Sequence, residues 1–276
     1  MNRRRIPEGF PWVLPSLLVL LALSIYPLIY SVKLAAADRG NFTRLFTDRL
    51  FLTASIQTIV LTIAALAIEF FLGLALALLV DSLARGRMFF RTALLIPMLL
   101  PPVVAAVAWR LIYNPQFGVL NGTLRWLGFH TAHLTWTSGE SSALASVILV
   151  DVWEWTPFLF LLLSAGLQAI PPEPLEAARV DGAGAWRIFR DVTLPLLKPT
   201  IVLALLLRAM DLVRIFDQIF ILTQGGPGTA TETVSLYIYR TAFRFSNFGY
   251  AAAMSFVLLA ATMLFSRGLL RAMRAR

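Results

Sequence analysis

Long apolar segments dominate the chain, and polar residues gather between them. Six segments reach the length of about 20 residues that a helix needs to cross the roughly 30 Å hydrocarbon core of a bilayer. They run over Trp12–Leu34, Phe51–Val80, Thr92–Tyr113, Ala143–Gln168, Leu196–Leu222 and Tyr250–Leu270. The short alternating stretches of membrane β-barrels do not dominate anywhere. The pattern therefore predicts an all-α, polytopic membrane protein with six transmembrane helices, built as a single domain over residues 1–276.

The composition supports this class of protein. Hydrophobic residues make up 58% of the chain and charged residues 14%, whereas soluble domains have about 45–50% and about 25%. The chain has no cysteine, which excludes disulfides, thiolate zinc sites and iron–sulfur clusters. The net charge is +9, and the basic residues of a membrane protein usually lie in its cytoplasmic loops. We therefore expect membrane lipid, and no nucleic acid, among the partners.

The distribution of Lys and Arg predicts the orientation. With the N-terminus inside, fourteen basic residues fall on the cytoplasmic side and six on the other. Cytoplasmic loops generally carry the excess, so both termini are predicted to be cytoplasmic and the chain to lie in the cell membrane. A cleaved signal peptide is the alternative for the first segment, but its apolar stretch exceeds the usual core of about 7–15 residues. The fourteen are Arg3, Arg4, Arg5, Arg85, Arg87, Arg91, Arg179, Arg187, Arg190, Lys198, Arg267, Arg271, Arg274 and Arg276.

The third apolar segment contains three prolines, Pro97, Pro101 and Pro102. An interior proline removes a backbone hydrogen bond and clashes with the preceding turn. In a membrane such breaks persist where neighbouring helices or a wet cavity satisfy the freed carbonyls. The sequence therefore predicts a broken helix that lines a pathway.

The fifth segment carries four charges, at Arg208, Asp211, Arg214 and Asp217. Together they would cost roughly 10–14 kcal/mol at mid-bilayer, against about 7 kcal/mol returned by the apolar residues around them. Opposite charges three positions apart are neighbours on a helix, so a ladder of pairs is one expectation. A polar lining for a solute is the other, and the two are compatible.

The fourth segment alternates carboxylates with indoles, at Asp151, Trp153, Glu154 and Trp155. Carboxylates accept hydrogen bonds from hydroxyl groups, and indoles offer flat apolar faces. This combination is suited to carbohydrate, although tryptophans near a membrane surface also serve as anchors. Glu69 in the second segment is a lesser candidate for the same pathway.

Sequence patterns of catalysis are absent. The chain has no P-loop, no HExxH and no GxSxG pattern, so we expect neither ATP hydrolysis by this chain nor a catalytic residue. His130 and His133 are spaced three apart without a clear third ligand, and no metal site is predicted. A chain without a P-loop would need its energy from elsewhere.

The segment from Pro171 to Pro195, between the fourth and fifth spans, predicts a short amphipathic helix. Pro174 suits the first turn, and the acidic Glu173 and Glu176 complement the positive end of the helix. Gly182 is a good terminator. A second helical piece follows over Trp186–Arg190 and leads through Pro195 into the fifth span. An ordinary loop lying on the membrane is the alternative.

This segment resembles the EAA signature of ABC-importer permeases. Glu176-Ala177-Ala178, Gly182 and Leu194-Pro195 have the spacing of that signature, with Val192 in place of Ile. The resemblance extends over almost the whole chain, to Asp151–Pro157, Arg208–Thr223 and Phe248–Ala253. The chain is similar to carbohydrate permeases, and among them to the maltose-type F-like subunit.

The resemblance implies the type I permease fold and one half of an importer. A second EAA-type permease subunit would complete the pathway, two ATP-binding cassette subunits would bind ATP and Mg²⁺, and an extracytoplasmic solute-binding protein would deliver the solute. The EAA helix would sit in a cleft of the ATPase. The residues this implies for coupling are Glu176, Ala177, Ala178, Asp181, Gly182, Leu194 and Pro195.

Two other functions compete with a sugar or polyol permease. An ion-coupled secondary carrier would also use acids inside the membrane, but such carriers often have repeated halves, and no convincing internal repeat is present. An integral-membrane enzyme would use Asp151 and Glu154 as acid and base. It lacks a matched nucleophile or metal set and leaves the EAA segment without a role.

Overall fold

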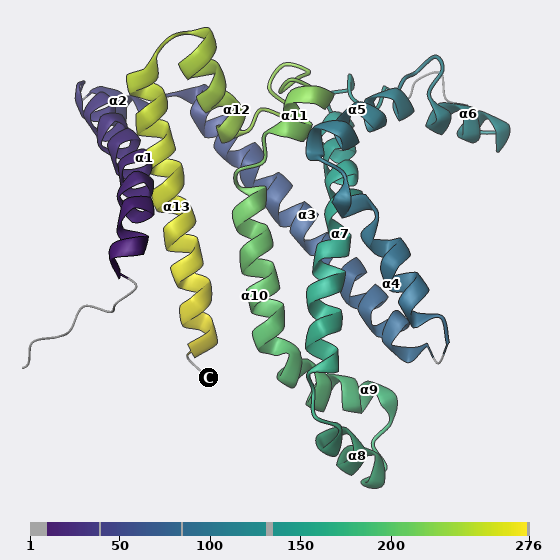
Figure 1. The fold of residues 1–276 in the computed structure, drawn as a ribbon. Helices are drawn as coiled ribbons and strands as arrows, with labels where there is room; N and C mark the ends of the chain where they lie inside the picture. Colours follow the sequence, from purple (N-terminus) through teal and green to yellow (C-terminus); the bar gives the residue numbers. More distant parts are fainter. Residues whose placement is uncertain (1–9, 39, 84, 131–134, 275–276) are drawn as a thin grey trace, which may run out of the picture. The chain divides into compact units, whose positions relative to one another are not determined.

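A computed structural model describes residues 10–38, 40–83, 85–130 and 135–274. Within these ranges every regular element is helical and none is a strand (Figure 1). Arg3, Arg4, Arg5, Arg39, His133 and Arg276, on which parts of the sequence argument rest, lie outside them. In chain order the elements are α1 (Phe10–Ala36), α2 (Gly40–Leu45), α3 (Arg49–Ser82), α4 (Arg87–Leu95), η1 (Pro97–Leu99), α5 (Pro102–Ile112), α6 (Val119–Trp126), α7 (Ala143–Gln168), α8 (Pro172–Val180), α9 (Ala185–Ile188), η2 (Phe189–Thr193), α10 (Leu194–Leu212), α11 (Asp217–Leu222), α12 (Val234–Tyr239), η3 (Arg240–Arg244) and α13 (Phe248–Arg274).

Five helical segments of the described chain are long and apolar enough to cross a membrane. A helix satisfies all of its backbone hydrogen bonds internally, which is what a chain in hydrocarbon requires. The prediction of an all-α, multi-pass membrane protein is thus confirmed for the described residues. The five segments are Trp12–Ala36, Arg49–Ser82, Ala143–Gln168, Ala185–Leu212 and Phe248–Gly268.

The third predicted span is interrupted where the prolines predict it. The helix α4 ends at Leu95, and η1 covers Pro97–Leu99 as a 3₁₀ turn. The backbone is then extended at Leu100 and Pro101 before α5 begins. The 11 residues of α5 span only about 16 Å at 1.5 Å per residue, which is short of the bilayer core.

The fifth predicted span ends earlier than the sequence indicated. The helix α10 ends at Leu212, four non-helical residues follow, and α11 starts anew at Asp217. The end is stabilised by Arg214, whose Nε donates to the carbonyl oxygen of Met210 at 3.0 Å. A basic side chain that binds the last free carbonyls is a common way to finish a helix. Arg214 and Asp217 therefore lie beyond α10, which corrects the prediction of one helix up to Leu222.

The described chain forms two compact units. The first contains the N-terminal residues up to Asp48 together with Ile238–Leu258. Within it, the hydroxyl of Tyr250 donates to the Asp48 carboxylate at 2.7 Å, and the Arg44 guanidinium lies over the Tyr250 ring at 4.8 Å. These contacts join the loop after α2 to the start of α13.

The second unit, Arg49–Tyr237 with Leu259–Arg276, contains the elements relevant to function. The most extensive helix contact in it is between α3 and α7, and α10 packs against both (Figure 1). An apolar core joins the three helices at one level of the bundle. Its fully or nearly buried members are Leu74, Ala77 and Val80 of α3, Phe160 and Leu163 of α7, and Leu197 and Ile201 of α10.

The close approach of α3 to α7 depends on a glycine. A Cβ added at Gly73 would lie 3.0 Å from the Leu159 Cβ and 3.1 Å from the Phe160 backbone nitrogen. Neither atom is the flexible end of a side chain, so the helices themselves would have to separate.

We therefore expect Gly73→Ala to lower the stability of the chain by roughly 1–3 kcal/mol, as overpacking of a tight interface does. The measurement is the unfolding midpoint of the detergent-solubilised chain in a denaturant titration. Gly122→Ala is the matched control, because Gly122 lies in helix α6 with no atom within 4 Å of an added Cβ. Equal midpoints for the two variants would contradict the role of Gly73.

Candidate functional site

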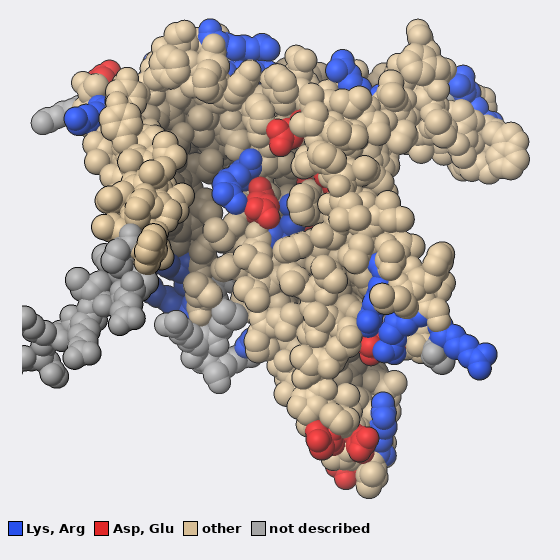
Figure 2. Space-filling model, in the orientation of Figure 1, with Lys and Arg blue, Asp and Glu red and all other residues tan. Residues whose placement is uncertain are grey.

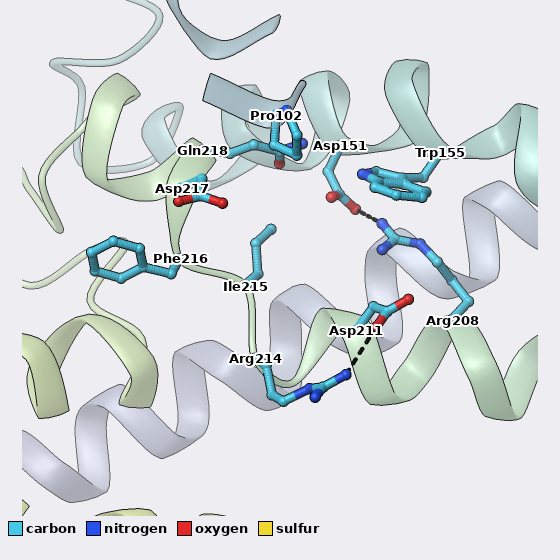
Figure 3. A pocket seen from close by; sticks show the side chains of 10 residues that line it. All are labelled: Pro102, Asp151, Trp155, Arg208, Asp211, Arg214, Ile215, Phe216, Asp217 and Gln218. Carbon is cyan, nitrogen blue, oxygen red and sulfur yellow. Dashed lines mark hydrogen bonds and ion pairs between the residues drawn. The ribbon is translucent and has the colours of Figure 1, made fainter. Parts of the chain in front are cut away.

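A buried ion cluster joins the three central helices of the second unit. The Arg208 guanidinium of α10 donates from Nε and Nη2 to the two carboxylate oxygens of Glu69 on α3, at 2.8 Å each. Its Nη2 also donates to Asp151 on α7 (Figure 3). The three side chains are at most 3% exposed. Two carboxylates therefore share one guanidinium.

An aromatic ring completes the surroundings of this arginine. The Arg208 guanidinium carbon lies 5.1 Å from the centre of the Trp155 ring, within the range of a cation–π interaction. Trp155 follows Asp151 by four residues on α7, so the two project from the same face of the helix. One face of α7 thus supplies both an acid and an indole to the same cation, as Figure 3 shows.

The charged ladder predicted along the fifth span forms only in part. Asp211 Oδ1 accepts from Arg214 Nη2 at 3.0 Å, and both side chains are about half exposed or more. Arg208 instead pairs with acids of two other helices. The reason is electrostatic: a bidentate Arg–carboxylate contact is strongest away from water, and Glu69 offers one in the interior.

A second buried polar pair lies next to the cluster. The Gln218 side chain of α11 donates from Nε2 to Glu154 Oε2 of α7 at 2.6 Å. Glu154 is 0% exposed and Gln218 is 2% exposed. Within the described residues the second oxygens of both side chains, Glu154 Oε1 and Gln218 Oε1, accept no hydrogen bond.

These groups surround an open cavity of about 370 Å³. It is bounded by the end of α10, the non-helical residues after it, the start of α11 and one face of α7 (Figure 3). Pro102, at the start of α5, closes one side. The lining residues are Pro102, Asp151, Trp155, Arg208, Asp211, Arg214, Ile215, Phe216, Asp217 and Gln218.

The structure brings together most of the pathway residues expected from the sequence. Asp151, Arg208, Asp211, Arg214 and Asp217 line the cavity. Glu154 stands behind the wall and holds Gln218.

Trp153 lies elsewhere: it is 38% exposed and its ring meets that of Trp109 at 5.5 Å. It is Trp155, and not Trp153, that presents an indole to the cavity.

Glu69, Gln218 and Trp155 are the residues whose importance the sequence understated. A lone acid in an apolar segment does signal a partner, but nothing in the sequence identifies that partner as Arg208, 139 positions away.

Among the described residues no group of three or more metal-ligating side chains is present.

The EAA-like segment forms the short helix that the sequence predicts. The helix α8 begins with Pro172 and ends at Val180, and Gly182 follows with a φ of 74°. A left-handed backbone strains a residue with a Cβ, so glycine is favoured there. Glu176, Ala177, Asp181, Gly182 and Pro195 are exposed, and Ala178 and Leu194 are half-buried.

This segment projects from the ends of α7 and α10 (Figure 1). Figure 2 shows acidic and basic side chains together on this projection. Behind α8, Asp191 of η2 accepts from Arg190 Nε at 2.7 Å. The tip exposes large apolar side chains as well, with Trp186 71% and Val180 87% exposed.

The chain matches the family described as the binding-protein-dependent transport system inner membrane component over residues 69–274. It belongs to this family of membrane transport subunits.

Curated relatives resemble it over nearly their full length. It is 34% identical over 267 residues to the trehalose/maltose transport system permease protein MalF of Thermococcus litoralis, covering 92% of this chain and 90% of that one. It is 38% identical to the trehalose transport system permease protein SugA of Mycobacterium tuberculosis, covering 92% and 84%.

The fold is shared with solved importers. A chain of a bacterial ABC transporter involved in the import of the acidic polysaccharide alginate superposes with a TM-score of 0.86 at 24% identity, covering 96% of this chain and 94% of that one. At that identity the likeness concerns the fold alone.

The ion cluster predicts a contrast between two arginines six positions apart. Arg208→Met should lower stability by about 3–5 kcal/mol, because it leaves two carboxylates buried without their cation. Arg214→Met should change it by no more than about 1 kcal/mol, since its pair is exposed. The unfolding midpoint in detergent measures both.

A triple variant, Arg208→Met with Glu69→Gln and Asp151→Asn, separates loss of charge pairing from loss of packing. It should recover part of the lost stability, because no unpaired charge remains buried. If Arg208→Met unfolds at the same denaturant concentration as Arg214→Met, the cluster is not a stabilising element.

Proposed function

We propose that this chain is the permease subunit of an ATP-driven importer and provides half of the pathway for a sugar, oligosaccharide or related polyol. The observation that carries the proposal is its similarity, over nearly the whole length of both chains, to permeases named for trehalose and maltose transport. A polar cavity with an indole face, built between otherwise apolar helices, is consistent with such a solute.

The importer would contain partners that supply what this chain lacks. A second EAA-type permease subunit would form the other half of the pathway, and two ATP-binding cassette subunits would bind ATP and Mg²⁺. An extracytoplasmic solute-binding protein would deliver the solute. The chain itself would act without a cofactor and without catalysing a reaction.

The topology that fits this role has six crossings, with both termini cytoplasmic, in a single permease domain. Five crossings correspond to the five long apolar helical segments. We propose that α4, η1 and α5 together make the sixth, since α5 alone is too short. The excess of Lys and Arg on the same side as the α8–α9 segment supports a cytoplasmic position for it.

In this topology α8 would be the coupling element. Its exposed Glu176 would make a charge-assisted hydrogen bond with the ATPase, and Ala177 and Ala178 would let the partner surface approach closely. Asp181 and Gly182 end the helix, and Leu194 and Pro195 are the first residues of α10. Closure of the ATPase would thereby move α10, which carries Arg208 and Asp211 to the cavity.

Charge reversal at the coupling helix tests this proposal. Glu176→Lys should leave membrane insertion unchanged while solute uptake falls at least tenfold, because a lost charge-assisted contact of about 1.5–3 kcal/mol corresponds to that factor. The assay is uptake of labelled trehalose and solute-stimulated ATP hydrolysis in proteoliposomes that contain the complete importer, with partners taken from the neighbouring genes.

Glu173→Lys is the matched control, since Glu173 is an exposed glutamate three residues earlier on the same helix. It should retain most of the uptake. Full uptake with normal ATPase stimulation in the Glu176→Lys variant would refute the coupling role. Uptake that persists without any ATPase, driven by an ion gradient, would favour an ion-coupled carrier instead.

A further inference from the structure

The cavity is rich in hydrogen-bond acceptors and its cations are already engaged. Three carboxylates, of Asp151, Asp211 and Asp217, line it against two guanidinium groups, of Arg208 and Arg214. Two further carboxylates stand directly behind the lining: Glu69, bound to Arg208, and Glu154, bound to Gln218. Among the groups that line the cavity itself, carboxylates outnumber guanidinium groups by one.

Each arginine of the cavity already holds at least one carboxylate. Arg208 donates to Glu69 through Nε and Nη2 and to Asp151 through Nη2, and its face lies against Trp155. Arg214 donates to the Met210 carbonyl through Nε and to Asp211 through Nη2. The Nη1 groups of both arginines donate to no described partner, but the positive charge of each is already balanced by a bound carboxylate, so an anion entering the cavity would meet a net negative lining.

The cavity wall also holds a buried acceptor without a donor. Gln218 lines the cavity, is 2% exposed, and its Oε1 accepts no hydrogen bond within the described chain. The Oε1 of Glu154, behind Gln218, also accepts no hydrogen bond within the described chain. A buried acceptor without a donor is costly, and a molecule that brings N–H or O–H donors relieves that cost. Asp217, exposed at the start of α11, adds a carboxylate with no ion pair among the described residues.

We infer that this cavity admits uncharged or cationic polyhydroxyl solutes and rejects anionic ones such as uronic acids. The inference rests on the proposed function, since it takes the cavity to lie on the solute pathway. Asp217 and Gln218 are its specificity-determining residues: the carboxylate repels anions and both side chains receive hydroxyl donors. The similarity to relatives does not decide this point, because the fold is also used for an acidic polysaccharide.

The absence of cysteine permits a direct test. Ile215→Cys places a single thiol in the cavity, at a residue whose side chain lies between the acids in Figure 3. The complete importer in detergent is reacted with a cationic aminoethyl and an anionic sulfonatoethyl methanethiosulfonate. Mass spectrometry of this chain gives the two rates, each divided by the rate with a free small thiol. Thr229→Cys, exposed in the loop before α12, is the reference site.

The cationic-to-anionic rate ratio should be on the order of tenfold higher for Ile215→Cys than for Thr229→Cys, because an acid-lined cleft concentrates cations. Adding Asp217→Asn should lower the ratio severalfold. Adding Glu140→Gln, which removes an exposed carboxylate outside the cavity, should leave it unchanged. Phe216→Cys lines the same cavity and repeats the measurement if the first variant folds poorly.

A ratio at Ile215→Cys equal to or below that of the reference overturns the inference. So does a ratio that falls as much with Glu140→Gln as with Asp217→Asn. Failure of the proposed function has a different signature: the unmodified complex would take up no labelled trehalose or other sugar, whatever the reagent rates. The two failures are therefore told apart by separate measurements.

Discussion

The packing of helices in the second unit depends on the high free energy of an unpaired charge in a medium without water. Arg208 could not remain on a membrane helix unless its charge were compensated, and it is compensated by acids of two other helices. The requirement fixes more than one contact: it sets the rotation of α3, α7 and α10 about their axes, since Glu69, Asp151 and Arg208 must face a common point. The apolar core of Leu74, Phe160 and Leu197 then packs at another level of the same three helices, where it adds contact area without dictating direction.

The same constraint explains the cavity. Once Arg208 is directed into the bundle, the next charges along the chain have no partner of opposite sign inside it. The helix ends at Leu212, and Arg214 caps the last turn and pairs with Asp211 at the surface of the opening. The end of α10, the restart of the chain at α11 and the proline-broken third span meet here, so the polar groups cluster where the backbone is irregular. Irregular backbone within a membrane is tolerated where it lines a cavity.

The sequence predicted local features well and distant pairings poorly. The prediction of helix α8 rested on a proline, two glutamates and a glycine within a dozen residues, and the prediction of a break before α5 rested on three prolines. Both depend on neighbours along the chain. The sequence did not identify Glu69 as the partner of Arg208. Asp211 lies three residues after Arg208 and three before Arg214, so the local spacing rule allowed it to pair with either arginine. Only the tertiary structure shows that Glu69 competes for the guanidinium. Gln218 was missed for a related reason: a neutral amide carries no charge penalty and so gives no signal in an apolar pattern.

The continuity of the chain from Ala185 to Leu212 has a mechanical consequence. The helix α9, the π-helical stretch η2 and α10 follow one another without a non-helical residue. Over the 23 steps from Ala185 to Arg208 such a rod measures about 35 Å at 1.5 Å per residue. Because the stretch is helical throughout, a displacement of α9 would reach Arg208 as a tilt or a translation of α10. Two irregularities lie along this stretch, the π-helical η2 and the interior proline Pro199 of α10, and bending or torsion would be absorbed there.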